Sequence, residues 1–214
     1  MRVDKDELLL YAITDRTWLN GDTLYNAVEK ALKGGATMIQ LREKELSYSE
    51  VLEEAIGLNE LCKAYNVPLI INDNVDIALE SGAAGVHIGQ EDGNIRAIRE
   101  RAGDKLIIGA TAHNVEEAVK AYNDGADYLG SGAVFGSVTK KNAVPMSKAT
   151  LIAITESVPI PVVAIGGITY DNMGVLSGTG IAGMALVSAV FAESDIEKAC
   201  HSLRERITKV VGNN

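Results

Sequence analysis

Arginine, lysine and amide side chains gather in one short segment, Gln40-Leu-Arg42-Glu-Lys44, directly after an apolar run of the chain. Alternation with a period of two places Gln40, Arg42 and Lys44 on the same side of an extended backbone. Two cations arranged in this way can hold a phosphate or a diphosphate through charge-assisted hydrogen bonds. The row would also suit a solvated strand edge, but an unpaired charge so close to a buried strand is costly. We therefore expect an anion clamp here.

Acidic and amide residues follow the next two apolar runs, with Asn72-Asp73 after residues 68–71 and Asp92 after residues 85–88. Either segment taken alone is typical of a helix N-cap. If both face the anion clamp, Asp73 and Asp92 suit Mg²⁺, which proteins hold through one or two carboxylates plus phosphate oxygens. The sequence predicts a magnesium site at Asp73 and Asp92, with helix capping as the alternative.

Glycine and serine occur after two later apolar runs, as Gly166-Gly167 before Thr169 and as Val187-Ser188. We expect both segments at helix starts, where backbone N–H groups and the helix dipole attract an anion. Glycine also permits close approach of the backbone to a ligand. The two segments predict a second phosphate site, separate from the cation clamp. A purely structural turn at the diglycine is the alternative.

Histidine and cysteine give no sign of covalent or zinc-based catalysis. His87 and His113 have no serine, cysteine or acidic partner at a motif spacing, and three histidines without paired cysteines do not indicate zinc. Cys62 and Cys200 fall at apolar positions of helical patterns, which favours core packing in a reducing compartment. No nucleophile stands out, so we expect catalysis through electrostatics and positioning.

Eight short β-type runs alternate with helical patterns along the chain, and the polar groups above follow runs of this kind. The near-continuous apolar character of most runs suits parallel strands that are covered on both faces. Serines three residues before a glutamate predict capping boxes at Ser47 and Ser194. The expected strands cover residues 8–13, 37–41, 68–71, 85–88, 106–109, 128–130, 161–165 and 183–187.

Four joints between a helical pattern and the next strand begin with glycine, at Gly34, Gly82, Gly125 and Gly180. Glycine there can adopt the left-handed conformation that ends a helix. The 214 residues divided among eight such units leave about 27 residues for each, enough for a closed barrel. An open doubly wound sheet is the weaker alternative because no GxGxxG turn follows an expected strand; the one match, at residues 178–183, precedes a strand. We predict an α/β fold, a single-domain (β/α)8 TIM barrel over residues 1–214.

The formal net charge of −9 at pH 7 argues against a nucleic-acid partner, which rewards a basic surface. A small anionic substrate stays compatible with this charge, because its site needs only local positive charge. No apolar stretch approaches the roughly 18 residues of a membrane span, and the N-terminus carries no apolar signal core. We expect a cytoplasmic protein with neither membrane nor nucleic-acid partners. The sequence leaves the oligomeric state open, a homo-oligomer included.

Six segments occur in a fixed order along the chain: Gln40-Leu-Arg42-Glu-Lys44, Asn72-Asp73, Val86-His87-Ile-Gly-Gln90-Glu-Asp92, Thr139-Lys140-Lys141, Ile165-Gly-Gly-Ile168 and Val187-Ser188. Together they resemble the thiamine-phosphate synthase family, from about residue 9 to residue 210. The resemblance implies a (β/α)8 barrel and a transferase of thiamine biosynthesis. Its reaction joins 4-amino-2-methyl-5-hydroxymethylpyrimidine diphosphate to 4-methyl-5-(2-phosphooxyethyl)thiazole and releases pyrophosphate.

The resemblance also implies roles for single residues of this chain. Asp73 and Asp92 would bind Mg²⁺, and Gln40 would contact the pyrimidine. The residues implied to hold the diphosphate are Arg42, Lys44, Asn72 and Lys140, assisted by Thr111; Arg42, Lys44 and Lys140 would promote its departure. The groups implied to receive the thiazole phosphate are Ser137, Thr139, Gly167 and the backbone of Val187 and Ser188. The residues left without a role are Glu43, Lys141, His87 and His113.

The segment after the sixth expected strand departs from the family pattern, with Ala133 in place of proline and Ser137 in place of threonine. Serine keeps the hydroxyl, whereas loss of the proline is expected to loosen the segment. The related thiazole tautomerase is a rival assignment, but Gln40 and Asp92 together favour the synthase. A non-catalytic relative would be expected to lose the metal carboxylates or Lys140, and this chain has all of them.

Overall fold

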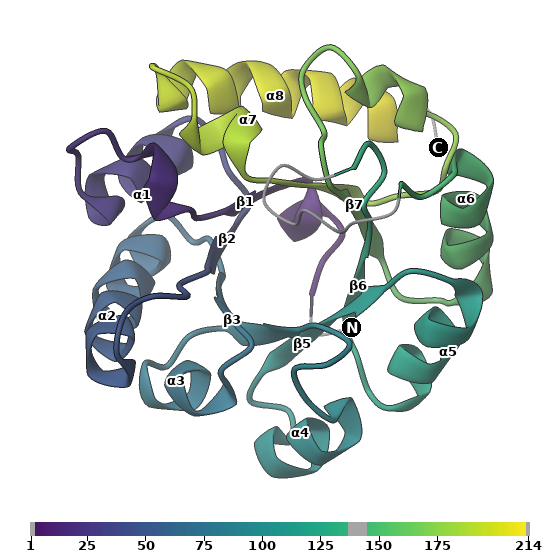
Figure 1. Cartoon of the computed structure of the whole chain (residues 1–214), viewed down its shortest axis with the longest axis horizontal. Coiled ribbons are helices and arrows are strands. Elements are labelled where there is room, and N and C mark those ends of the chain that lie inside the picture. The colour runs from purple at the N-terminus through teal and green to yellow at the C-terminus, as the bar shows by residue number, and fades with distance from the viewer. Residues whose placement is uncertain (1–2, 137–144, 213–214) are drawn as a thin grey trace.

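The computed structural model describes residues 3–136 and 145–212, which form a closed barrel of eight parallel strands with helices around it (Figure 1). Each strand pairs with its neighbours in sequence order, and pairing of β8 with β1 closes the ring. The predicted TIM barrel is confirmed, and each expected strand overlaps an observed one. The strands are β1 (Leu10–Ile13), β2 (Met38–Leu41), β3 (Leu69–Asn72), β4 (Gly85–Ile88), β5 (Ile107–Ala112), β6 (Tyr128–Gly132), β7 (Val162–Ile165) and β8 (Gly183–Leu186).

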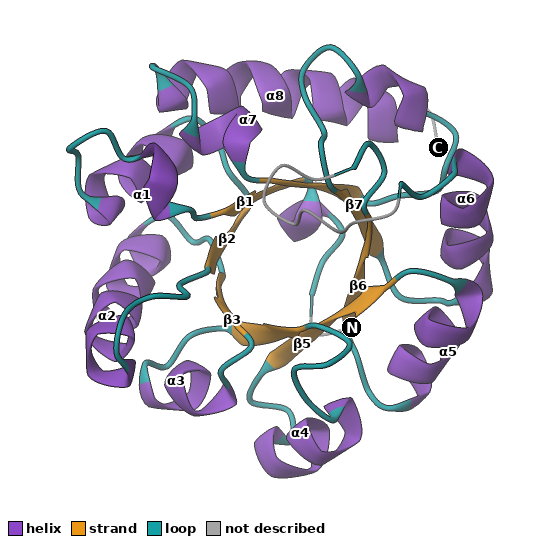
Figure 2. Cartoon of the chain, in the orientation of Figure 1, coloured by secondary structure: helices purple, strands orange, loops and turns teal. Residues whose placement is uncertain are grey.

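Helices surround the strands, so that the sheet is covered on its whole outer face (Figure 2). The α-helices in the described part of the chain are α1 (Leu24–Lys33), α2 (Tyr48–Ala64), α3 (Val75–Glu80), α4 (Ile95–Ala102), α5 (Val115–Asn123), α6 (Lys148–Ser157), α7 (Ser188–Phe191) and α8 (Ile196–Val211). Three short 3-10 helices accompany them: η1 (Asp6–Leu8), η2 (Arg16–Trp18) and η3 (Met173–Leu176).

The N-terminal segment closes the end of the barrel at which the strands begin. Figure 1 shows η1 through the opening of the ring, and Val3 and Leu8 are buried among the interior side chains. Gly183 allows this close approach, because a Cβ atom there would lie 1.9 Å from the carbonyl oxygen of Leu8. The opposite end, where the strands finish, is left for ligand binding.

Local signals set most helix starts, but only one of the two capping boxes predicted from the sequence is present. The capping box predicted at Ser47 is confirmed, because its side chain accepts from Glu50 N and the Glu50 side chain accepts from Ser47 N. The box predicted at Ser194 is wrong: Asp195 caps α8 by accepting from Lys198 N, since a carboxylate is as good a cap as a hydroxyl.

Two helix starts expected near the phosphate site also differ from the structure. The diglycine at residues 166–167 leads into a loop and then η3, so no α-helix begins directly after it. Val187-Ser188 opens the one-turn helix α7, and the long helix α8 starts eight residues later. The second phosphate site predicted at these two places would therefore depend on loop conformation more than on a long helix dipole.

Apolar side chains fill two layers, one between strands and helices and one inside the barrel. Cys62 and Cys200 belong to the outer layer, and burial raises the pKa of both thiols to about 12, so they pack as neutral side chains. Within the described ranges, no helix is long and apolar enough to cross a membrane.

One buried ion pair fixes the joint between α5 and β6 to the preceding unit. Arg99 of α4 contacts Asp127 at 2.5 Å and donates to the carbonyl oxygen of Gly125 at 2.9 and 3.1 Å. Asp127 also accepts from Ile108 N at 2.8 Å, which ties the joint to β5. The side chains of Arg99 and Asp127 are 16% and 7% exposed. Removing one partner of such a pair leaves the other uncompensated, which is far more costly than loss of an exposed pair.

We expect Asp127→Ala to lower the free energy of unfolding by about 3 kcal/mol, because it leaves Arg99 and Ile108 N short of an acceptor. Asp76→Ala is the matched control, since the Asp76–Arg101 pair is 52% and 55% exposed and its loss should change stability little. Urea denaturation followed by circular dichroism measures both variants. An equal fall in the free energy of unfolding in the two variants would contradict the claim that burial makes the Arg99–Asp127 pair important.

Candidate active site

A cavity of about 970 Å³ occupies the mouth of the barrel, and every strand contributes to its lining. Of the residues singled out from the sequence, the described ones all reach this cavity: Gln40, Arg42, Lys44, Asn72, Asp73, Asp92, Thr111, Gly167, Val187 and Ser188. His87 and His113 line it as well, whereas Glu43 lines a smaller neighbouring groove. Ser137, Thr139, Lys140 and Lys141 lie outside the described residues.

The cation side of the cavity is built on the segment that follows β2. Thr14, which is buried, accepts from Arg42 N at 3.0 Å and donates to the Arg42 carbonyl oxygen at 3.4 Å, so the backbone at Arg42 is fixed to the end of β1. Lys44 Nζ lies 2.7 Å from Asp73 Oδ2, and Asn72 Nδ2 donates to Asp73 Oδ1 at 2.9 Å. Lys44 of the predicted anion clamp thus lies next to Asp73, a predicted metal ligand.

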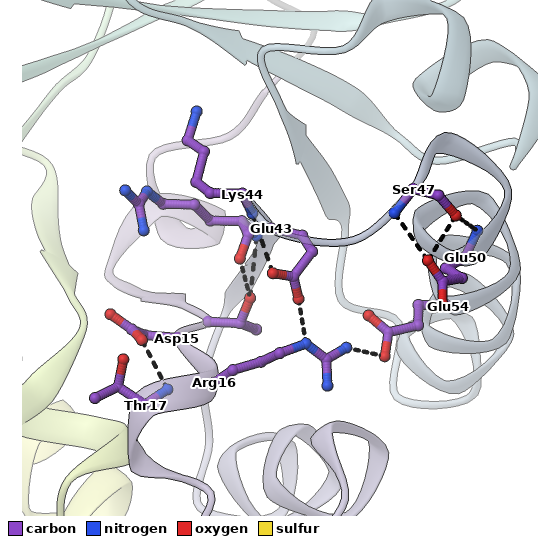
Figure 3. Close-up of polar contacts among 10 residues, drawn as sticks. Asp15, Arg16, Thr17, Glu43, Lys44, Ser47, Glu50 and Glu54 are labelled. Atoms are coloured by element: carbon purple, nitrogen blue, oxygen red, sulfur yellow. Dashed lines mark hydrogen bonds and ion pairs between the residues drawn. The ribbon is translucent and has the colours of Figure 1, made fainter.

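Glu43 turns away from the central cavity and holds the clamp from behind (Figure 3). Its carboxylate pairs with Arg16 of η2, and Arg16 also pairs with Glu54 of α2. The Glu43 side chain is 6% exposed and that of Arg16 is 36% exposed, so the carboxylate of this pair is shielded from water. Arg16 therefore links the loop after β1, the segment after β2 and helix α2. We expect Glu43 and Arg16 to position the neighbouring Arg42 and Lys44.

The capping alternative for the two aspartates is wrong. Asn74 caps α3 by accepting from Ile77 N, and Asn94 caps α4 by accepting from Ala97 N. Asp73 instead adopts a left-handed backbone with φ of 62°, and its backbone N donates to the carbonyl oxygen of His87 at 2.9 Å. Both aspartates line the central cavity and the adjoining groove. Neither carboxylate therefore caps a helix.

On the opposite side of the cavity, glycines allow two backbone segments to pack closely. Gly166 and Gly167 have φ of 100° and 65°, and a Cβ atom at Gly167 would lie 2.8 Å from the carbonyl oxygen of Phe135. Phe135 N donates to the Gly166 carbonyl oxygen at 3.0 Å, so the segment after β6 lies on the loop after β7. Ala133 takes part in the same packing, because its carbonyl oxygen accepts from Met146 N at 2.7 Å.

Two tyrosines were missed by sequence reasoning, Tyr11, which lines the cavity, and Tyr128, which lies beneath it. Tyr11 of β1 and Tyr128 of β6 are fully buried, and their hydroxyl groups lie 2.8 Å apart inside the barrel. Gln40 Nε2 donates to Tyr11 OH at 2.5 Å, His87 Nδ1 lies 3.1 Å from Tyr128 OH, and His87 Nε2 lies 3.1 Å from Thr111 Oγ1. Both tyrosines had the appearance of ordinary strand residues in the sequence.

His113 lies at the rim, where it contacts Glu117 at 2.9 Å on the first turn of α5. The Glu117 carboxylate also accepts from the backbone N of His113 at 2.7 Å. Hydrogen bonds from His113 and Asn114 lower the pKa of Glu117 and outweigh the opposing effect of burial. These contacts stabilise the start of the helix.

Comparison with known proteins agrees with this geometry. The family model described as thiamine monophosphate synthase matches residues 10–190. The chain belongs to this family. A thiamine-phosphate synthase from Clostridium botulinum is 44% identical over 207 residues, covering 97% of each chain. One from Clostridium novyi is 47% identical over 195 residues, covering 91% of this chain and 96% of its own.

Solved structures extend the likeness to three dimensions. A thiamine phosphate pyrophosphorylase from Pyrococcus furiosus superposes with a TM-score of 0.90 at 41% identity, covering 97% of this chain and 99% of that one. A 3-hexulose-6-phosphate synthase, at 14% identity and a TM-score of 0.66, shares the barrel alone. The family resemblance expected from the sequence is confirmed, and with it the assignment as a thiamine-phosphate synthase, a transferase of thiamine biosynthesis.

The buried bracing of the clamp can be tested without turnover. We expect Arg16→Met to weaken pyrophosphate binding about 10-fold, because Glu43 loses its cation and the segment with Arg42 and Lys44 loses its fixed position. Lys33→Met on α1 removes the same charge from an exposed pair with Glu29 and serves as control. Isothermal titration calorimetry with pyrophosphate measures both. The same affinity in the two variants would refute the bracing role.

Proposed function

We propose that this chain joins 4-amino-2-methyl-5-hydroxymethylpyrimidine diphosphate to 4-methyl-5-(2-phosphooxyethyl)thiazole, by Mg²⁺-assisted dissociative substitution. The observation that carries the proposal is that one cavity has two different kinds of lining on its two sides. One side has the cations Arg42 and Lys44 with two carboxylates, and the other has backbone at Gly167 and Ser188. A diphosphate and a monophosphate fit these two sides, and full-length relatives bear the corresponding name.

The residues on the cation side fit Mg²⁺. Asp73 and Asp92 supply hard carboxylate oxygens, and the buried Oδ1 atom of Asn72 has no hydrogen-bond partner among the described residues. Two carboxylates next to a diphosphate would repel it unless a cation lies between them. Mg²⁺ is held in this way, by one or two carboxylates together with phosphate oxygens. When bound, the metal would neutralise charge on the leaving pyrophosphate.

Side chains of this protein would provide the remaining stabilisation of the leaving group. Arg42 and Lys44, with Asn72 and Thr111, would hold the diphosphate, joined by Lys140 from outside the described residues. Each cation about 4 Å from the leaving group contributes on the order of 4 kcal/mol before desolvation, at an effective dielectric of about 20. The aminopyrimidine delocalises positive charge, so its bond to the diphosphate breaks before the thiazole nitrogen attacks.

The thiazole phosphate would lie across the cavity, at Gly167 and the Val187-Ser188 backbone, with Ser137 and Thr139 closing over it. Binding there fixes the ring nitrogen near the pyrimidine carbon, which converts a bimolecular step into one with a high effective concentration. The proposal also places the enzyme in the cytoplasm, which agrees with Cys62 and Cys200 as free, buried thiols. Its partners would be these small phosphorylated substrates.

The proposed reaction is tested by incubating the protein with both substrates and Mg²⁺ and following pyrophosphate and thiamine phosphate together. We expect the two products in equal amounts, and none when either substrate is omitted. Pyrophosphate release without thiamine phosphate would contradict the synthase activity, as would absence of both products while the thiazole substrate still binds.

The division of the site into two sides predicts a selective effect of Asp92→Ala. We expect Mg²⁺-dependent turnover to fall about 100-fold, because the leaving charge loses part of its neutralisation. Binding of the thiazole phosphate, measured by calorimetry, should stay unchanged. Glu100→Gln changes an exposed acidic residue of α4 and serves as the control for net charge. Parallel losses of turnover and thiazole-phosphate binding would contradict the division.

A further inference from the structure

A single line of hydrogen bonds crosses the barrel interior and ends at the cavity at both sides. It runs from Gln40 of β2 to Tyr11 of β1, then to Tyr128 of β6, His87 of β4 and Thr111 of β5. All except Tyr128 line the cavity. Tyr128 has no accessible surface, so it can affect a ligand only through the groups it contacts.

Glycines in two strands leave the space that this line occupies. A Cβ atom at Gly109 would lie 2.1 Å from the ring of Tyr128, and one at Gly130 would lie 3.1 Å from the ring of His87. Glycine inside a strand weakens it, and it is found where another group must approach closely. The Tyr128 ring also packs against Tyr11 edge to face, with centroids 6.0 Å apart.

With Gln40 Nε2 as the first donor, the line has an order in which each hydroxyl donates its single hydrogen to the next member. In this order Tyr11 oxygen accepts from Gln40 Nε2, and Tyr11 donates its own hydrogen to Tyr128. In the same order Tyr128 donates to His87 Nδ1, and the Nε2 hydrogen of His87 is donated to Thr111. Burial raises the pKa of both phenols far above neutrality, so both keep the hydrogen that this order requires.

The polarity determines what the two ends offer to a ligand. Gln40 Oε1 has no hydrogen-bond donor among the described residues, so this oxygen is available as an acceptor at the cavity. Thr111 oxygen accepts from His87, so the Thr111 hydrogen is available as a donor. An acceptor and a donor are thus presented at fixed places in one cavity.

We propose that Tyr128 is a positioning residue that sets the ring specificity of this enzyme by fixing the amide orientation of Gln40 and the hydroxyl direction of Thr111. The inference rests on the proposed function and deepens it. The exocyclic amino group of the pyrimidine is a donor and matches Gln40 Oε1. The diphosphate is an acceptor and matches the Thr111 hydroxyl.

The opposite polarity would mispair the same substrate at both ends. If the Gln40 amide were reversed, its NH₂ group would face the amino group of the pyrimidine, and Tyr11 would donate to Oε1. The order would then run backward through Tyr128, and Thr111 would turn a lone pair toward the diphosphate. A pyrimidine with an oxo group in place of the amino group would suit the reversed amide. This buried line of hydrogen bonds therefore selects a pyrimidine with an amino group over one with an oxo group.

The test compares the pyrimidine diphosphate with its 4-oxo analogue as substrates for the wild type, Tyr128→Phe and Tyr11→Phe. We expect the wild type to favour the amino compound in kcat/KM by about 100-fold or more, since a mispaired buried amide is costly. Both variants interrupt the line and free the Gln40 amide to reverse, so this preference should fall about 10-fold. Binding constants of the two diphosphates, from calorimetry, should show the same change in ratio.

The control is Ile70→Val, which removes one methylene-sized group from the same interior cluster without touching the line. It should lower stability while leaving the amino-to-oxo preference at the wild-type value. The proposal would be overturned if Tyr128→Phe and Tyr11→Phe lowered kcat/KM equally for both substrates and left the preference unchanged. The line would then only stabilise the fold. A wild type that binds the amino compound preferentially but forms no thiamine phosphate would contradict the proposed function alone.

Discussion

Closure of the strands into a ring is the constraint on which the site depends. Tyr11 and Tyr128 are 117 residues apart in the chain, yet their hydroxyl groups lie 2.8 Å from each other because β1 and β6 face across the same interior. An open sheet of the same strands would carry these side chains on one face at widely separated positions. Closure also brings the carboxyl ends of all strands to one rim, so that short segments after different strands share one cavity.

An acidic protein must hold its few cations where an anionic substrate will bind. Lys44 is paired with Asp73 through side chains that are 50% and 21% exposed, a pair that costs little to separate. Arg16 and Glu43 form a second pair next to these cations, and its carboxylate is better buried, at 6% exposed. In the proposed reaction, a cation at Asp73 would release Lys44 toward the diphosphate. The Lys44–Asp73 pair can therefore separate when ligands bind, whereas the Arg16–Glu43 pair would hold the backbone around it in place.

The sequence predicted the fold well because each βα unit carries the same local signals. Apolar runs, glycine at the joints and the capping box at Ser47 all act within a few residues. It failed where two local signals compete, as at Ser194 and Asp195, which can both cap α8. For Asp73 and Asp92 the capping alternative stayed open in the sequence, because only the structure shows that Asn74 and Asn94 are the caps.

The buried tyrosines show what sequence patterns cannot reach. A tyrosine in a strand looks the same whether its hydroxyl meets water or a partner from the far side of the barrel. The available signal was indirect: Gly109 and Gly130 interrupt two strands where larger residues would be expected. A buried polar line costs desolvation that an apolar core would avoid, and it is tolerated when every member is hydrogen-bonded. Its persistence through five strands, with both ends at the cavity, is easier to explain by ligand selection than by stability.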